Sequence, residues 1–189
     1  GLPLNKLVSV TTDGAPAMTG KDKGFIGILK HKLESENNDP VKLITLHCII
    51  HQQVLCSKVL KMSHVMDAVV KSVNFIRAHS LNHRQFKNFL ISIDSDFLEI
   101  PLHCDVRWLS RGKVLSRFFE LRPFIAEFLL SKQKEIPEIS DPNWIQDLAF
   151  LVYIVEHLNH LNLNLQGKNN LIYNIVDFVS SFKMKISLW

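Results

Sequence analysis

The first 48 residues alternate between short apolar runs and one stretch of helical periodicity. Lys6 to Thr12 is an apolar, β-branched run that stops at the turn residues Asp13 and Gly14, which predicts a buried strand. Residues 16–36 place four apolar side chains on one helical face: Phe25, Ile26, Leu29 and Leu33. Residues 41–48 form a second apolar run. A strand, helix and strand within this length predict two neighbouring parallel strands.

Beyond residue 48 the apolar positions recur with the period of a helix. The expected helices are 49–61, 64–78, 84–93, 110–121, one that begins at Pro123 and runs to about 134, 143–164 and 169–188. Residues 95–108 are expected to be irregular or briefly extended, and residues 134–142 to form a loop. Two strands do not make a stable sheet by themselves, so these helices are expected to form a separate layer or insertion.

Composition limits the class of protein. Hydrophobic residues make up 47% of the 189 positions, with only seven Gly and seven Pro, as expected of a packed globular chain. His, Lys or Asn interrupts each apolar run before it reaches the roughly 18 residues of a membrane span, so no membrane partner is expected. The net charge of +4 permits a polyanionic partner without requiring one.

The cysteines indicate the redox compartment of the protein, and the first residue indicates whether the chain is a fragment. Cys48, Cys56 and Cys104 are an odd number, widely spaced among apolar residues, which favours buried thiols in a reducing compartment over a disulfide framework. The chain begins at Gly1 in the middle of a pattern. We therefore expect it to be a fragment of a longer protein.

The stretch "LVSVTTDGAPAMTG", from Leu7 to Gly20, ends a strand on the carboxylate of Asp13. One interpretation is that Thr12 or Asp13 accepts the free N–H groups at the start of the following helix. The other is that Asp13 lies at the carboxyl edge of a sheet, where α/β folds bind ligands, and holds a metal ion. The residues by themselves leave both interpretations open.

Cys48 and His51 lie one helical turn apart, so their side chains can meet. A structural zinc site needs four ligands, and the nearby His47, Cys56 and His64 have no recognised spacing, so a buried thiol and a hydrogen-bonded imidazole are favoured. The sequence also lacks the G-x-S-x-G, Walker and dinucleotide-binding motifs.

The stretch "CDVRWLSRGKVLSRF", Cys104 to Phe118, surrounds one indole with cations: Trp108 with Arg107, Arg111, Lys113 and Arg117. Cations at this spacing can neutralise phosphates, and an indole can stack on an unpaired base. The alternative is a core tryptophan beside a solvated basic face.

Five stretches in this order, "TTDGAPAMTG", "LHCIIHQ", "VRWLSRGKVLSRF", "HLNHLNLNLQGKNNLI" and "SFKMKISLW", resemble the hAT superfamily of DNA transposases, and most closely its domesticated, Charlie-type descendants. The resemblance implies an α/β fragment of a ribonuclease-H-like fold over residues 1–47. The first part of an all-helical insertion would follow over residues 48–189, so that the chain is predominantly helical.

In that family two Asp and one Glu bind two divalent ions, Mg²⁺ or Mn²⁺, for strand cleavage and transfer. The resemblance matches Asp13 to the second Asp, and Cys48 and His51 to a C-x-x-H motif whose His lies near the catalytic centre. Arg107 and Trp108 match an R-W pair whose Trp stacks on a flipped base. One carboxylate cannot hold two ions, so this chain alone is expected to be inactive and to bind no ion tightly.

The resemblance therefore implies an ancestral nuclear function in DNA binding and metal-dependent strand transfer. The alternative is a domesticated, non-catalytic nuclear protein that uses the fold for protein interaction, dimerisation or regulation of transcription. DNA is the expected partner in the first case, and a second copy or another protein in the alternative.

Overall fold

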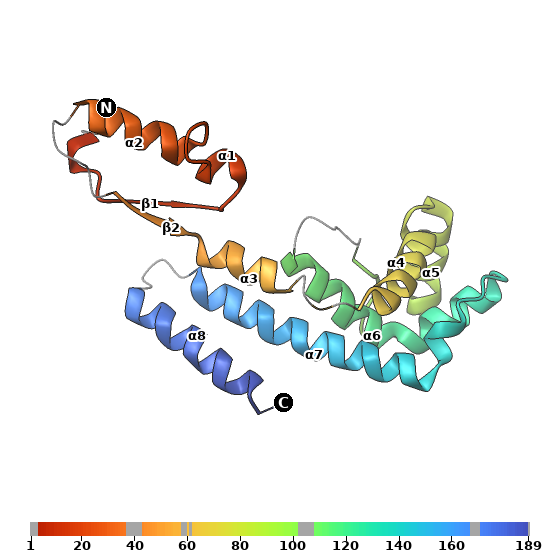
Figure 1. Cartoon of the computed structure of the whole chain (residues 1–189). Coiled ribbons are helices and arrows are strands. Elements are labelled where there is room, and N and C mark those ends of the chain that lie inside the picture. The colour runs from red at the N-terminus through yellow and green to blue at the C-terminus, as the bar shows by residue number, and fades with distance from the viewer. Residues whose placement is uncertain are drawn as a thin grey trace. The chain divides into compact units, whose positions relative to one another are not determined.

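The computed structural model describes residues 4–36, 43–57, 60, 62–101, 108–166 and 171–188 (Figure 1). In chain order the elements are η1 (Leu4–Lys6), β1 (Ser9–Thr12), α1 (Pro16–Thr19), α2 (Phe25–Glu36), β2 (Ile44–His47), α3 (Ile49–Ser57), α4 (Ser63–Arg77), α5 (Ser80–Ser92), α6 (Trp108–Ser131), η2 (Pro137–Ser140), α7 (Pro142–Leu165) and α8 (Ile172–Ile186). The chain forms two compact units, Gly1–Val59 and Leu60–Trp189.

In the first unit β1 and β2 pair in parallel, with Ser9 opposite Ile44 and Thr12 opposite His47. The predicted neighbouring parallel strands are therefore confirmed. Because side chains alternate across a strand, Leu43 points to the opposite face from Ile44. Leu43 is buried, as are Ile26 and Leu33 of α2, so these three residues supply the small core of this unit.

The predicted single helix over residues 16–36 is interrupted by a turn at residues 20–24, which separates α1 from α2. Glycines allow this turn to fold back closely. A Cβ added to Gly27 would lie 1.9 Å from the carbonyl oxygen of Lys21, and one added to Gly24 would lie 2.3 Å from the backbone nitrogen of Gly20. A larger residue at either position would push the turn away from α2.

The expected ribonuclease-H-like α/β fold is wrong for this chain. Within the described residues the only sheet has two strands of four residues each. One face of this sheet remains open, since Ile44 and Leu46 are each 49% exposed. A parallel α/β core needs a larger sheet that is covered on both faces, and the described residues do not provide it.

The second unit is helical. No strand occurs among its described residues, in agreement with the periodicity beyond residue 48. Its core lies between α4, α5, α6 and α7, and its largest fully buried side chains are Ile76, Phe86, Leu90, Ile100, Leu115, Phe118, Leu121, Ile125, Leu129, Leu148 and Leu151. Phe118 of α6 packs edge-on against Trp144 of α7, with ring centroids 6.3 Å apart. No helix within the described ranges is long and apolar enough to cross a membrane.

Helix α6 runs through Pro123, where the sequence predicts the start of a new helix. A proline in a helix interior cannot donate to the carbonyl four residues earlier, here that of Phe119. The guanidinium of Arg122 donates to this oxygen instead, at 3.2 Å, and also lies over the Phe119 ring. The side chain therefore replaces the backbone donor that proline removes, and the helix continues.

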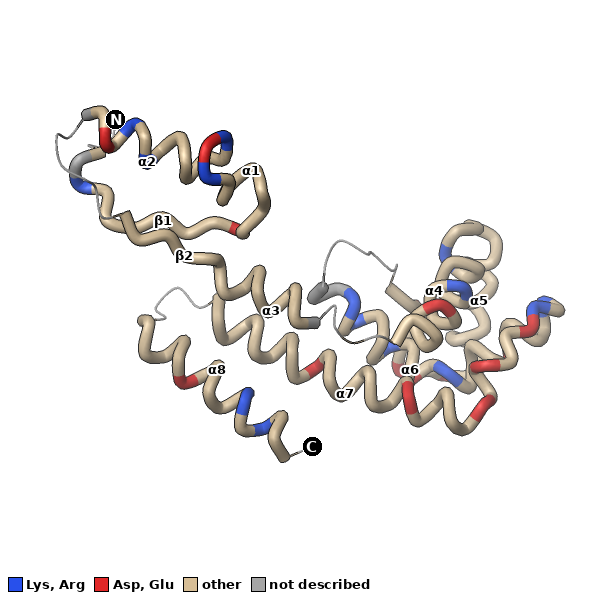
Figure 2. Tube along the Cα trace, viewed as in Figure 1, with Lys and Arg blue, Asp and Glu red and all other residues tan. Residues whose placement is uncertain are grey.

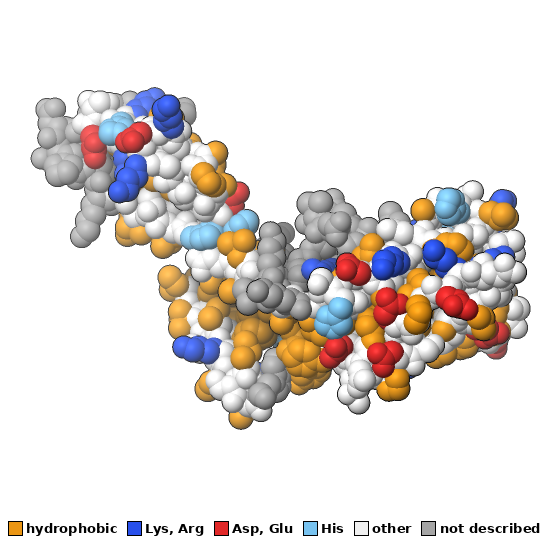
Figure 3. Space-filling view, turned by 45° about the vertical axis from the view of Figure 1, so that its right-hand side comes forward, with side chains coloured by type: hydrophobic (Ala, Val, Ile, Leu, Met, Phe, Trp, Pro, Cys, Tyr) orange, Lys and Arg blue, Asp and Glu red, His pale blue; other side chains and the backbone are white. Residues whose placement is uncertain are grey.

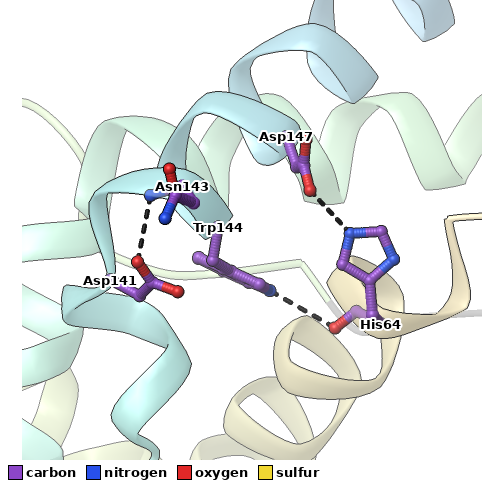
Figure 4. A network of polar contacts seen from close by, with 5 residues as sticks. All are labelled: His64, Asp141, Asn143, Trp144 and Asp147. Carbon is purple, nitrogen blue, oxygen red and sulfur yellow. Dashed lines mark hydrogen bonds and ion pairs between the residues drawn. The ribbon is translucent and has the colours of Figure 1, made fainter.

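A polar network joins the first turns of α4 and α7 (Figure 4). His64 Nε2 lies 2.8 Å from Asp147 Oδ2, and the Trp144 indole donates to the backbone oxygen of His64 at 3.3 Å. Asp141 caps α7 by accepting from the backbone N–H of Asn143 at 3.0 Å. These contacts fix the start of α7 against α4.

Candidate functional site

Asp13 directly follows β1, at the carboxyl end of the strand, and is exposed. Its Oδ1 accepts the backbone N–H of Ala15 at 3.0 Å, the geometry of an Asx turn. The first residue before α1 is Ala15, which makes no side-chain capping bond. The carboxylate thus shapes the turn after β1 without capping the helix, and it stays open to solvent.

Gly14 brings the imidazole of His47 against this turn. The backbone of Gly14 has a φ of +78°, in the left-handed region, and a Cβ added to Gly14 would lie 2.6 Å from His47 Nε2. His47 ends β2 opposite Thr12, and the next backbone N–H, that of Cys48, donates to the Thr12 oxygen at 2.7 Å. Strand pairing therefore places His47 beside the Asp13–Gly14 turn.

His51 extends the group of side chains at this edge. It lies in the first turn of α3 and is half-buried, and its ring centroid is 5.5 Å from that of His47. Cys48, also half-buried, stands between the two histidines in sequence. The sequence motifs do not indicate His47 as a residue of this site. Its position in register with Thr12, at the end of the paired strand, is the signal that could have identified it.

The donor atoms at this edge do not fit a pair of divalent ions. Within the described residues no three His, Cys, Asp or Glu side chains form a group that could hold one metal ion. Two-metal phosphoryl transfer needs several hard oxygen donors around a shared phosphate. Asp13 alone does not provide them.

A cavity of about 610 Å³ adjoins the same edge, between the sheet and α2. Thr12, Gly14 and His47 line one side of it. The charged residues of its wall are Lys21, Asp22, Lys30 and Glu34, so both signs are equally present. This balance does not single out an anionic or a cationic ligand.

The other candidate surface is the basic stretch at the start of α6. Arg107 lies outside the described residues, as does the side chain of Trp108. Arg111 is half-buried and Lys113 is exposed. The guanidinium of Arg117 lies 3.5 Å from the centroid of the Phe97 ring, and its Nε lies 3.5 Å from Glu120 Oε2. Arg117 is thus engaged within the protein, which a helical-periodicity argument cannot foresee.

Lys113 and Arg117 line a groove of about 720 Å³ between α6 and α7. Phe97, Pro101 and Leu163 supply its apolar surface, and the acids Glu120 and Glu156 lie on the same walls. We call this surface the α6–α7 groove. Helix α6 carries both basic and acidic residues, whereas the charged residues of α7 are two acids, Asp147 and Glu156 (Figure 2). The space-filling view shows acidic, basic and histidine side chains interspersed on one face of the helical unit (Figure 3).

The two helices approach closely beneath this groove. A Cβ on Gly112 would lie 2.0 Å from Asn159 Nδ2, so only glycine allows the amide of α7 to pack on the α6 backbone. The floor of the groove is therefore closely packed at this point.

The chain is similar to one protein family and to relatives from two mammals. Residues 47–189 match the family described as FAM200-GTF2IRD2-like, the FAM200/GTF2IRD2 helical domain. The chain is 40% identical over 187 residues to General transcription factor II-I repeat domain-containing protein 2 of Bos taurus, and 41% identical over 185 residues to that of Mus musculus. Both alignments cover 98% of this chain but only 19% and 20% of the relatives, about a fifth of their length. No solved structure matches the chain.

Proposed function

Because the chain belongs to the FAM200/GTF2IRD2-like family, we propose that it is an interaction segment of a domesticated, transposon-derived nuclear protein. In this proposal it acts by binding another protein and performs no DNA strand transfer. The relatives are named for general transcription factor II-I repeats, which supports a nuclear, transcription-related role. The order of the five stretches quoted above supports descent from a hAT transposase.

The α6–α7 groove is the observation that carries this proposal. Its apolar residues, Phe97 and Leu163 among them, lie beside Lys113 and Glu156, which have opposite charges. Protein interfaces combine an apolar centre with a polar rim in this way. A surface for DNA phosphates needs unopposed cations, whereas here Glu120 already pairs with Arg117.

The test is a charge swap across the groove. Capture from nuclease-treated nuclear extract is compared for the wild-type chain and for Lys113→Glu combined with Glu156→Lys, which leaves the net charge unchanged. A matched control swaps Asp67→Lys with Lys71→Glu on the exposed face of α4. We expect the groove variant, and not the control, to lose a defined set of partners. Capture by the wild-type chain that occurs in untreated extract but not in the nuclease-treated extract would instead show that nucleic acid is the partner.

DNA binding is the second candidate function, and exposed Lys113 together with the net charge of +4 favours it. The residues that the sequence suggests for this role are Arg107, Trp108, Arg111, Lys113 and Arg117, and of these Arg117 is expected to contribute least because it already pairs with Glu120. It predicts that the chain binds DNA containing an unpaired base more tightly than plain duplex, and that Trp108→Ala removes this difference. Equal binding of both DNAs by the wild-type chain would exclude base stacking.

Asp13 and His51 are proposed as remnants of the ancestral catalytic edge. The purified chain is therefore expected not to nick supercoiled DNA in Mg²⁺ or Mn²⁺, since the described donor atoms do not fit two ions. Cleavage that required metal and was lost in Asp13→Ala would contradict the non-catalytic proposal. The same assay on Asp22→Ala controls for contaminating nuclease.

A further inference from the structure

Helix α8 packs against α7 without burying a side chain completely. All fifteen of its residues are described, and none is buried. Phe178 and Phe182 face Leu161 of α7 around a cavity of about 220 Å³, so the apolar contact between the two helices is incomplete. Elements with few buried apolar contacts open at low free energy. Small changes in the polar contacts of α8 can therefore decide whether it stays docked.

One polar contact joins the two helices close to this cavity. Lys185 Nζ of α8 lies 3.2 Å from His157 Nδ1 of α7. The Tyr153 ring meets the same imidazole edge-on, with centroids 4.4 Å apart, and so holds its orientation. A neutral imidazole with Nδ1 unprotonated accepts a hydrogen bond from the ammonium of Lys185. A protonated imidazole has no acceptor and instead faces a like charge.

The charged surroundings of His157 favour the neutral form. Burial lowers the pKa of its imidazole, Lys185 of α8 and His160 of α7 lower it further, and Glu156 of α7 opposes them. When α8 is not docked on α7, the imidazole of His157 returns to its ordinary pKa of about 6.5. At pH values near and below about 6.5 the docked state therefore binds fewer protons than the undocked state, so docking weakens as the pH falls through this range, whereas well above it docking does not change.

We propose that His157 and Lys185 form an acid-sensitive latch that holds α8 against α7, and that protonation of His157 releases the helix. This inference goes beyond the proposed function and does not depend on it. Release exposes the apolar residues Phe178 and Phe182, which line the cavity in the docked state. A modest local acidification would thus change which surface the helical unit presents.

Hydrogen exchange of the complete chain tests the latch. Protection of residues 172–186, corrected for the intrinsic pH dependence of exchange, is compared at pH 7.5 and 5.5, with α4 as internal reference. We expect protection in α8 to fall by about threefold or more while that of α4 stays the same. Equal protection of α8 at the two pH values would overturn the proposal.

Two variants test whether His157 and Lys185 cause the fall in α8 protection at low pH. His157→Gln keeps a neutral acceptor at every pH and should abolish the fall, and Lys185→Met removes the like charge and should reduce it. Lys183→Met, at an exposed position on α8, is a matched control that should retain the wild-type fall. If His157→Gln disturbs folding, Lys185→Met decides alone, and an undiminished fall in Lys185→Met excludes the latch.

Discussion

Gly14 and His47 fix each other's position at the carboxyl edge of the sheet. The φ of +78° at Gly14 favours glycine by itself, and the imidazole fills the space that a Cβ would need. The Asp13 turn, the end of β2 and the first turn of α3 are therefore coupled through one glycine. A substitution at Gly14 is therefore expected to disturb all three of these segments at the carboxyl edge of the sheet.

Gly14→Ala should destabilise the first unit by about 2 kcal/mol or more, because it adds backbone strain and a clash with His47. The measurement is hydrogen exchange of the Cys48 amide, whose bond to the Thr12 oxygen reports strand pairing. In a His47→Ala background the clash is absent, so the same substitution should cost only about 1 kcal/mol. Equal costs in the two backgrounds would show that His47 does not contact Gly14.

Asp13→Asn, at the residue next to Gly14, is the control for the Gly14→Ala substitution. The amide oxygen can still accept from the Ala15 N–H, so the turn should persist and Cys48 protection should change by less than about 0.5 kcal/mol. A large loss of protection would mean that the charge itself stabilises the turn, which the exposed position of Asp13 argues against.

Helix α6 depends on a side chain to pass through Pro123. Arg122 donates to the Phe119 carbonyl, which proline leaves without its usual donor. Periodicity predicts two helices here because a proline usually marks a first turn, and the compensating guanidinium is visible only in three dimensions.

Arg122→Met should lower the free energy of unfolding of the helical unit by about 1 kcal/mol, the usual contribution of one hydrogen bond. Urea unfolding measures it, followed by the fluorescence of Trp144, which is buried against Phe118, in a chain whose other two tryptophans, Trp108 and Trp189, are changed to Phe. In a Pro123→Ala background the backbone N–H of residue 123 can donate to Phe119, so the same substitution should cost much less. A cost that is unchanged in that background would mean that Arg122 acts through packing on the Phe119 ring.

The sequence predicts the local elements better than the surfaces they form. The β-branched runs before Asp13 and before Cys48 were sufficient to predict paired parallel strands. The larger fold expected from the resemblance was wrong, since two short strands with Ile44 and Leu46 exposed cannot make an α/β core. The engagement of Arg117 with Phe97 and Glu120 could not be predicted either, because Phe97 lies outside α6 and reaches Arg117 only through tertiary packing.

The molecule as a whole carries a small positive charge distributed over two compact units. If it binds duplex DNA, Lys113→Gln should reduce the slope of log affinity against log salt by about 1, the change expected for one lost phosphate contact. Arg117→Gln should change this slope much less, because Arg117 already pairs with Glu120. Fluorescence anisotropy at several salt concentrations measures both slopes, and a larger change for Arg117 would place it on the DNA surface.

The pairing of Ser9 with Ile44 has a kinetic consequence. When β1 pairs with β2, the chain closes a loop that contains α1, α2 and the turn between them. Helices α6 and α7, in contrast, are joined by a short connection that contains η2. Contacts between distant segments form slowly because the chain loses loop entropy before it gains their energy. During refolding, protection of the amides of α6 and α7 should therefore precede protection of the Cys48 amide, which reports the pairing of β1 with β2.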